Sequence, residues 1–412
     1  MAMPRVLTLL EGLLAVVQLA VVSCRAGTLK FAPPVIVGNL SGWGDSDGAV
    51  QFDGDTIIVP TSKGTLISTD GGRTHIANPG GNLPGGVLLK VSPGVLYEIS
   101  PTIPTSRQGY NFTQAKGSYE ISRSGGETGK ITAMPGNRPA TYISLPQLVT
   151  CKQGLRTDGC CGCPFRVGGH GNGGAVFIKR DGNYLQTVNV FFARTTQHQG
   201  PSSLTLYSSR DGLLWEFRAL VANASHFPHS EEGPNESALV CLADGETLMV
   251  VMRMDGGDGP PDRRHSTLYQ SFSSDDGKTW STPAVMQPPA VLSVRPKLLM
   301  MDAQGPGKGP LLLTTGRPGI ALWVNWDGMG RTWEMKNVAQ LHNSMFDGGS
   351  AAMFSPQVVE GNAYFSPYQS SVYNSLVATN TSTTAVIYYN RRSIKGYEAP
   401  DAVYAMRITA EV

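Results

Sequence analysis

The sequence predicts an all-β fold: a six-bladed β-propeller of four-stranded antiparallel blades. The 412 residues include 49 Gly and 28 Pro, a content of turn formers that is typical of many short strands and that disfavours a helical bundle. Hydrophobic residues make up 41% of the chain, enough to bury a large core and to exclude a disordered protein. A turn sequence also recurs at intervals that suit four-stranded units.

The first 26 residues have the features of a secretory signal. Arg5 precedes an apolar run over residues 6–22, and Ser23 to Ala26 supply small residues for cleavage. An uncleaved membrane anchor is the alternative. It is disfavoured because the run falls short of about 20 residues and contains Glu11. We therefore expect a secreted protein with one domain over residues 27–412 and no membrane span once the signal is removed.

The recurring turn is complete at Ser273 to Trp280, which reads Ser-X-Asp-X-Gly-X-Thr-Trp. In such a turn Asp accepts hydrogen bonds from backbone N–H groups two residues on, Gly supplies a positive φ, and Trp packs beneath the hairpin. The motif is therefore a structural one and not a catalytic site. Imperfect copies start at residues 68, 122, 208 and 325, and the first of them has His75 in place of Trp.

Strand-like runs lie between these turns, and removal of the signal leaves about 386 residues, enough for roughly six blades. A last strand near Ala402 to Ile408 is expected to close the ring. Asp53-Gly54-Asp55 and Asp244-Gly245-Glu246 are the polar turns ahead of two of the runs. The predicted strands are Thr56–Pro60, Val188–Ala193, Thr247–Met252, Leu311–Thr315 and Ala385–Tyr389.

Four of the six cysteines crowd one Gly-rich loop, at Cys151, Cys160, Cys161 and Cys163. Export favours two disulfides there, and a four-thiolate zinc site is the alternative. Cys241 lies in an apolar run and is expected to be buried. Five Asn-X-Ser/Thr sequons fit a secreted glycoprotein. They are Asn39, Asn111, Asn223, Asn235 and Asn380.

Charge and ligand composition exclude several partners. The chain carries 33 basic and 31 acidic residues, a net charge of +2, and this balance gives no electrostatic footprint for nucleic acid. No loop has a dense run of metal ligands, so we expect neither a metal ion nor a redox cofactor.

Three segments follow one another in an informative order. Asn235-Glu236-Ser237-Ala238-Leu239 leads to Arg253, Gly316-Arg317-Pro318-Gly319 comes next, and Tyr373-Asn374-Ser375-Leu376 comes last. Together with the recurring turns, or Asp-boxes, this order resembles the sialidase (exo-α-sialidase) superfamily, most strongly over residues 203–390. The resemblance implies that Tyr373 is a nucleophile with Glu236 as its base, and that Arg253 and Arg317 bind the substrate.

The chemistry of the implied substrate explains these residue types. Sialic acid has a carboxylate on its anomeric carbon, so an Asp or Glu nucleophile would approach against a like charge, whereas a neutral Tyr avoids that repulsion. Arginines bind a carboxylate through paired, planar N–H groups, which Lys does not offer. The expected partner is a glycan that ends in sialic acid or a related acidic sugar.

The chain departs from the family pattern at three places. No Arg occurs between Arg25 and Arg73, where the family has its first carboxylate-binding arginine, although Arg166 in a Cys-Pro-Phe-Arg segment is a weak substitute. Residues 60–63, where the family has its acid/base Asp, contain no carboxylate, and the acidic residues farther upstream are Asp45, Asp47, Asp53 and Asp55. Tyr388-Tyr389-Asn390 has no Glu at the position where the family has one.

These departures support a second hypothesis, a catalytically inactive sialidase-like propeller that binds acidic glycans. Retention of the Tyr, the Glu and two of the arginines favours the enzyme. The sequon at Asn235 conflicts with a site around Glu236, because a glycan there would project into it. Either the sequon is unoccupied or the site is not used.

Overall fold

The computed structural model of the chain describes residues throughout the predicted domain, 27–412. The predicted signal segment, the four clustered cysteines, Asn111, Asp45, Asp47 and Arg317 lie outside the described residues. Those residues are 27–39, 48–79, 87–92, 95–99, 112–114, 119–123, 131–135, 142–144, 166–167, 176–178, 182–191, 201–212, 214–230, 232–254, 268–286, 295–303, 305, 308–316, 319–360 and 373–411.

Within these ranges the protein is all-β, with strands grouped into six sheets and with few helices. The first sheet contains β3 (Val50–Asp53), β4 (Thr56–Thr61), β5 (Gly64–Ser68) and β6 (Ile76–Ala77). The second contains β7 (Val87–Ser92), β8 (Val95–Ile99), β10 (Tyr119–Arg123) and β11 (Ile131–Pro135). The third contains β9 (Phe112–Gln114), β12 (Tyr142–Ser144), β13 (Arg166–Val167), β14 (Val176–Ile178), β15 (Tyr184–Phe191), β16 (Ser202–Ser209) and β17 (Leu214–Ala222).

The other three sheets and the helices complete the description. The fourth sheet contains β18 (Ser237–Cys241), β19 (Leu248–Met252), β20 (Tyr269–Ser273) and β21 (Ala284–Val285). The fifth contains β22 (Lys297–Met300), β23 (Leu311–Gly316), β24 (Ile320–Asn325) and β25 (Glu334–Asn337). The sixth contains β1 (Thr28–Phe31), β2 (Val35–Asn39), β26 (Ser375–Ala378), β27 (Thr384–Arg391) and β28 (Ala402–Glu411). The helices are η1 (Ala224–His226), α1 (Val338–Met345), η2 (Ser350–Ala352) and α2 (Pro356–Val359).

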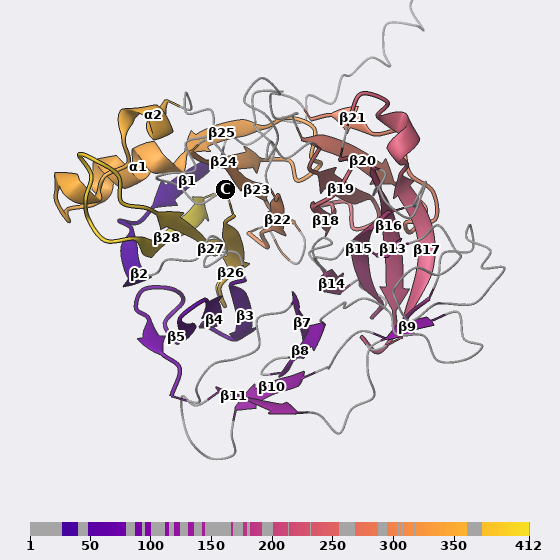
Figure 1. Cartoon of the computed structure of the whole chain (residues 1–412), viewed down its shortest axis with the longest axis horizontal. Coiled ribbons are helices and arrows are strands. Elements are labelled where there is room, and N and C mark those ends of the chain that lie inside the picture. Colours follow the sequence, from indigo (N-terminus) through magenta and orange to yellow (C-terminus); the bar gives the residue numbers. More distant parts are fainter. Residues whose placement is uncertain are drawn as a thin grey trace, which may run out of the picture.

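The sheets follow one another around a common centre, and neighbouring sheets meet there through their central strands (Figure 1). β3 lies beside β7, β7 beside β14, β14 beside β18, β18 beside β22, β22 beside β26, and β26 lies again beside β3. At the last junction the Ala49 N–H donates to Ser375 Oγ at 3.0 Å. Residues at the ends of these central strands are therefore brought together even when they are far apart in sequence.

The core lies between neighbouring sheets. Leu248 and Val250 of β19 pack toward β16 of the third sheet, whereas Met249 and Val251 pack toward the fifth sheet. All five residues of β19 are fully buried. A strand that is covered on both faces needs apolar residues without alternation. This explains why β19 is apolar throughout and why β23 and β27 contain the apolar runs Leu311–Leu313 and Ala385–Tyr389.

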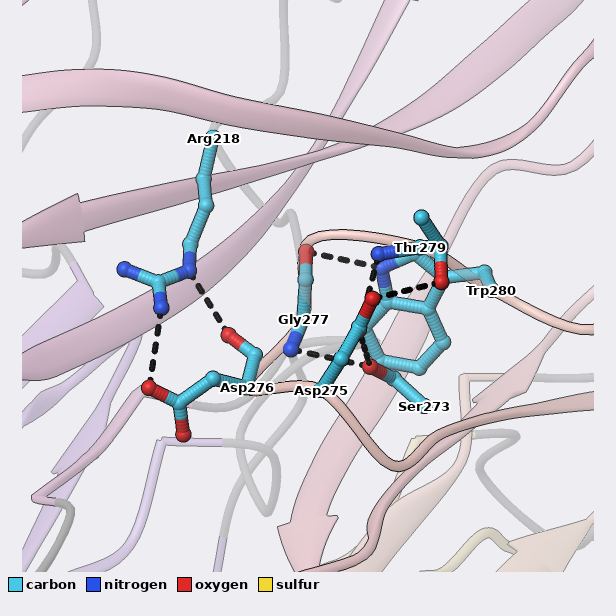
Figure 2. A network of polar contacts seen from close by, with 7 residues as sticks. All are labelled: Arg218, Ser273, Asp275, Asp276, Gly277, Thr279 and Trp280. Carbon is cyan, nitrogen blue, oxygen red and sulfur yellow. Dashed lines mark hydrogen bonds and ion pairs between the residues drawn. The ribbon is translucent and has the colours of Figure 1, made fainter.

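The turn after β20 forms much as the sequence predicts (Figure 2). Asp275 Oδ1 accepts from the N–H of Thr279 at 2.9 Å and from Ser273 Oγ at 2.9 Å. Trp280 Nε1 donates to the Gly277 carbonyl at 3.3 Å, which holds the indole beneath the turn. In this copy the Asp carboxylate reaches an N–H group four residues on and not two. The predicted spacing of two residues occurs in the last copy, where Asp327 Oδ1 accepts from the Met329 N–H at 2.9 Å.

This turn also attaches the fourth sheet to the third. Gly277 has φ +79, and a Cβ there would lie 2.5 Å from Leu206 Cδ2 of β16, so both the conformation and the close approach require glycine. Arg218 of β17 donates through Nε to the Asp276 carbonyl at 2.7 Å and through Nη2 to Asp276 Oδ2 at 3.1 Å (Figure 2). These two bonds from Arg218 anchor Asp276, whose backbone φ is +71.

The other described copies of the turn vary the same design. Trp215 and Trp333 donate to the carbonyls of Gly212 and Gly330 at 3.1 and 3.2 Å. The serine of the third copy is Ser209 and not the predicted Ser208, because Ser209 Oγ contacts Asp211 and accepts from the Gly212 N–H. In the last copy Asn325 Oδ1 accepts from the Gly330 N–H at 2.7 Å, so an amide replaces the serine hydroxyl.

The first copy closes the circle of sheets. His75, which replaces Trp, has its Nε2 at 3.0 Å from Tyr388 Oη of β27 in the sixth sheet. Gly72 lies against Val386 of the same strand, where a Cβ would approach to 2.8 Å. β28, the predicted last strand, pairs with β27 and also with the N-terminal strands β1 and β2, so the two ends of the described chain share one sheet.

Three details differ from the sequence predictions. β15 begins at Tyr184, four residues before the predicted start, and ends at Phe191. Cys241 ends β18, its Sγ lies 3.8 Å from the Leu242 carbonyl oxygen, and it is half-buried rather than buried. α1 was not predicted; it begins after Asn337, whose Oδ1 accepts from the Gln340 N–H at 3.0 Å, and it covers the fifth and sixth sheets. In the described part of the chain, no helix has the length and apolar character needed to cross a membrane.

Candidate functional site

Glu236 and Arg253 are brought together by the β18–β19 hairpin. Glu236 precedes β18 and Arg253 follows β19, and the register Ser237–Met252 makes them the next cross-strand pair. The Arg253 N–H donates to the Glu236 carbonyl at 2.8 Å, which extends the ladder by one step. Their side chains are thus neighbours because of the pairing itself.

Tyr373 joins this pair from the sixth sheet. It stands two residues before β26, as Glu236 stands one residue before β18. β22 lies between β18 and β26 and contacts both strands. The starts of the central strands therefore converge at one end of the ring, and side chains from the fourth and sixth sheets meet there.

The three polar groups form a closed set of hydrogen bonds. Tyr373 Oη donates to Glu236 Oε1 at 2.9 Å, and Arg253 Nη1 donates to Glu236 Oε2 at 2.6 Å. Arg253 Nη1 also donates to Tyr373 Oη at 3.3 Å. One oxygen of the Glu236 carboxylate thus accepts a hydrogen bond from the phenol, and the other accepts one from the guanidinium. In this arrangement Glu236 is placed to take the phenol proton.

Burial and charge set the protonation states of this set. The side chains of Arg253 and Glu236 are only 5% and 15% exposed. Burial lowers the pKa of Arg253, but the charges of Glu236 and Tyr373 more than compensate, so that the pKa lies above its ordinary value. Burial and the charge of Glu236 raise the pKa of Tyr373. At neutral pH the phenol is therefore protonated and the guanidinium is charged.

Two further basic residues border the site and were missed in the sequence analysis. Arg295 is 9% exposed, and its Cζ lies 5.8 Å from the centroid of the Tyr373 ring. Burial lowers the pKa of Arg295 to about 10 although the charge of Tyr373 opposes the shift. Lys297 begins β22, and its pKa lies well below its ordinary value. Burial is the larger cause, and repulsion from the charge of Arg295 is the smaller one. The signal in the sequence that could have indicated Arg295 and Lys297 as site residues is their place directly ahead of the apolar run 298–300.

The remaining candidates have other places. Arg317 lies outside the described residues, between the end of β23 and the start of β24. Asp55 is a turn residue, since its Oδ1 accepts from the Asn380 N–H at 3.1 Å. Residues 61–64 form the tight β4–β5 hairpin. Asn390 is 4% exposed within β27.

Both polar atoms of the Asn235 side chain form hydrogen bonds beside Glu236. Its Nδ2 donates to Glu232 Oε2 at 2.8 Å, and its Oδ1 accepts from the Glu236 N–H at 2.6 Å. A glycan would replace one of the two Nδ2 hydrogens, next to the bond with Glu232, and would stand beside Glu236. The geometry therefore fits an unmodified Asn235.

Across the described ranges, no group of three or more His, Cys, Asp or Glu side chains is arranged to bind a metal ion. The polar groups that converge are a phenol, a carboxylate and guanidinium groups. Such a set can activate a hydroxyl nucleophile and bind an anion.

No family model matches the chain, and no curated protein matches it. Solved structures do. A protein of unknown function from Dyadobacter fermentans has a TM-score of 0.56 at 14% identity, over 92% of this chain and 99% of that one. The GH93 α-L-arabinofuranosidase of Fusarium graminearum, in complex with arabinobiose, has a TM-score of 0.50 at 12% identity, over 92% and 98%. The Hadza microbial sialidase Hz136 has a TM-score of 0.49 at 14% identity, over 90% and 68%. At these identities a likeness shows the fold alone, and this chain shares its fold with the Dyadobacter protein and with the arabinofuranosidase.

Proposed function

We propose that the protein is a secreted retaining glycosidase that removes terminal sialic acid, or a related acidic sugar, from glycoconjugates. The observation that carries the proposal is the 2.9 Å hydrogen bond from Tyr373 Oη to Glu236 Oε1, with Arg253 bound to both groups. The closed order of sheets around one centre supports a six-bladed propeller as the scaffold. Secretion rests on residues 1–26.

The reaction begins with proton transfer from Tyr373 to Glu236. The Tyr373 oxygen forms a bond to the anomeric carbon as its proton passes to Glu236, and the bond from that carbon to the leaving oxygen breaks. The leaving oxygen departs with the electron pair and takes a proton from solvent. Water then attacks the same carbon and loses a proton to solvent, while Tyr373 leaves and regains its proton from Glu236. Two inversions at one carbon give net retention.

The charges around the site support an anionic substrate. Arg253 balances Glu236, and Arg295 adds a second buried guanidinium beside Tyr373. Two buried guanidinium groups therefore border the site, and guanidinium groups attract anions. We assign carboxylate binding to Arg253 together with Arg317, because paired guanidinium N–H groups match a carboxylate in geometry and charge.

A propeller that binds acidic glycans without cleaving them is the second candidate. The observation that favours it is the composition of the β4–β5 hairpin. Residues 60–63 read Pro-Thr-Ser-Lys and contain no carboxylate at the place where the resemblance calls for the acid/base Asp. Such a protein would keep Arg253 for binding and would have no acid to protonate a poor leaving group.

Turnover of an aryl α-sialoside together with a sialyl disaccharide separates the two candidates. A fluorogenic phenol leaves without help from an acid, whereas cleavage of the disaccharide, which the proposed function predicts, needs a proton on a poor leaving group. We expect the purified protein to release the phenol and to give the α-anomer of sialic acid first, as followed by proton NMR. Aryl α-L-arabinofuranoside and aryl β-galactoside are the matched neutral substrates and are expected to stay intact. Saturable sialoside binding without turnover would favour the second candidate. Cleavage of the neutral glycosides alone would overturn the acidic substrate class.

A further inference from the structure

Arg295 contacts Tyr373 in a way that differs from the contacts of Glu236 and Arg253. Those two residues bind the hydroxyl group, whereas the Arg295 guanidinium lies over the ring face, 5.8 Å from its centroid. We propose that Arg295 is a positioning residue for Tyr373, which holds the ring and stabilises the negative charge that the phenol acquires when its proton moves to Glu236. The inference rests on the proposed function, since it gives Arg295 a role in the same step.

The place of Arg295 in the fold makes this contact a fixed one. Arg295 stands two residues before β22, the strand between β18 and β26, and it is 9% exposed. It therefore approaches Tyr373 from the sheet between the two that supply Glu236 and Tyr373. A cation within about 6 Å of an aromatic ring face is attracted by the electrons of the ring.

The attraction grows when the phenol ionises. In the neutral ring the guanidinium meets only a quadrupole, but in the phenolate it meets a full charge that is delocalised into the ring. Burial strengthens the second interaction more than the first, because Coulomb energy rises as the effective dielectric constant falls. A contact that is stronger in the charged state lowers the barrier to attack and does not merely bind the substrate.

Lys297 complicates a test that replaces Arg295 alone. Arg295 repels the Lys297 ammonium and so contributes to the lowered pKa of Lys297, which the charge of Glu236 opposes. If Arg295 loses its charge, this repulsion ends and the pKa of Lys297 rises, so that a charge on Lys297 can replace part of the lost charge. The experiment therefore needs Arg295→Met, Arg295→Lys and the double variant Arg295→Met/Lys297→Met. The exposed Arg210, in the turn after β16, offers the control Arg210→Met.

The first readout does not depend on turnover. We place 3,5-difluorotyrosine at position 373, so that the phenol ionises within the range in which the protein stays folded, and follow its fluorine NMR signal against pH. Arg295→Met/Lys297→Met is expected to raise the pKa of this phenol by about one unit or more. Arg295→Lys is expected to raise it less, and Arg210→Met is expected to leave it unchanged.

The second readout separates positioning from substrate binding. With an aryl sialoside and natural Tyr373, the double variant is expected to lower kcat by about 10- to 100-fold and to change KM by less than about threefold. An unchanged phenol pKa in a folded double variant would overturn the inference. A large rise in KM with kcat unchanged would also overturn it and would assign Arg295 to substrate binding. If the wild-type protein shows no turnover, the proposed function fails, and the fluorine titration still decides the role of Arg295.

Discussion

The Tyr373→Phe variant is expected to lose about 1,000-fold or more in kcat/KM for an aryl sialoside and to keep its fold. The change removes one oxygen atom, which is the proposed nucleophile, and a covalent pathway cannot proceed without it. The ring remains available to pack, and Arg295 still lies over its face. The structural cost is the loss of the hydrogen bonds with Glu236 and Arg253, about 1 kcal/mol each.

Steady-state kinetics and urea unfolding together test this expectation. Tyr397→Phe is the matched control, because Tyr397 is half-buried in the segment between β27 and β28, away from the site, and is expected to keep full activity. Activity of Tyr373→Phe within tenfold of the wild type, in a variant that urea unfolding shows to be folded, would show that Tyr373 is not the nucleophile.

Arg253→Met is expected to abolish activity and to destabilise the fold as well. The side chain of Glu236 is 15% exposed, and Arg253 is its ion-pair partner at 2.6 Å. Removal of one partner leaves a mostly buried carboxylate without its counter-charge, and such a change costs about 3 kcal/mol or more. We therefore expect the free energy of unfolding at pH 7 to fall by about that amount.

A double variant separates the charge from the loss of packing. In Glu236→Gln/Arg253→Met no charge is left without its partner, so the double variant is expected to recover part of the lost stability but none of the activity. Arg218→Met, which breaks the more exposed pair with Asp276, is expected to cost about 1 kcal/mol or less. Equal effects of Arg253→Met and Arg218→Met on urea unfolding would contradict the description of the site as buried and charge-coupled.

The parts of the fold that the sequence predicts are those with a local signal. Ser273 to Trp280 closes on itself through contacts within five residues, so its form follows from its sequence alone. β19, β23 and β27 are covered on both faces and contain apolar runs. By contrast, the pairing of Thr28 with Glu411 joins the two ends of the described chain. No periodicity in either segment indicates its partner.

The same distinction holds for the site. Glu236 and Arg253 lie 17 residues apart around one hairpin, so a strand prediction already places them near each other. Tyr373 is 137 residues from Glu236 and was indicated only by the resemblance to sialidases. Arg295 was missed because a basic residue ahead of a strand is usually solvated. Its burial depends on β18 and β26 lying on either side of β22, which only the fold reveals.

The most direct measurement of the central claim is a chemical trap for the covalent intermediate. A 3-fluorosialosyl fluoride has a good leaving group and an electronegative substituent that slows the second step, so the glycosyl-enzyme accumulates. Digestion and mass spectrometry are expected to find one added fluorosialosyl group, on Tyr373, and no label in the Glu236→Gln variant at the same exposure time. A label on Glu236 itself, or on another tyrosine with Tyr373 unmodified, would contradict the account.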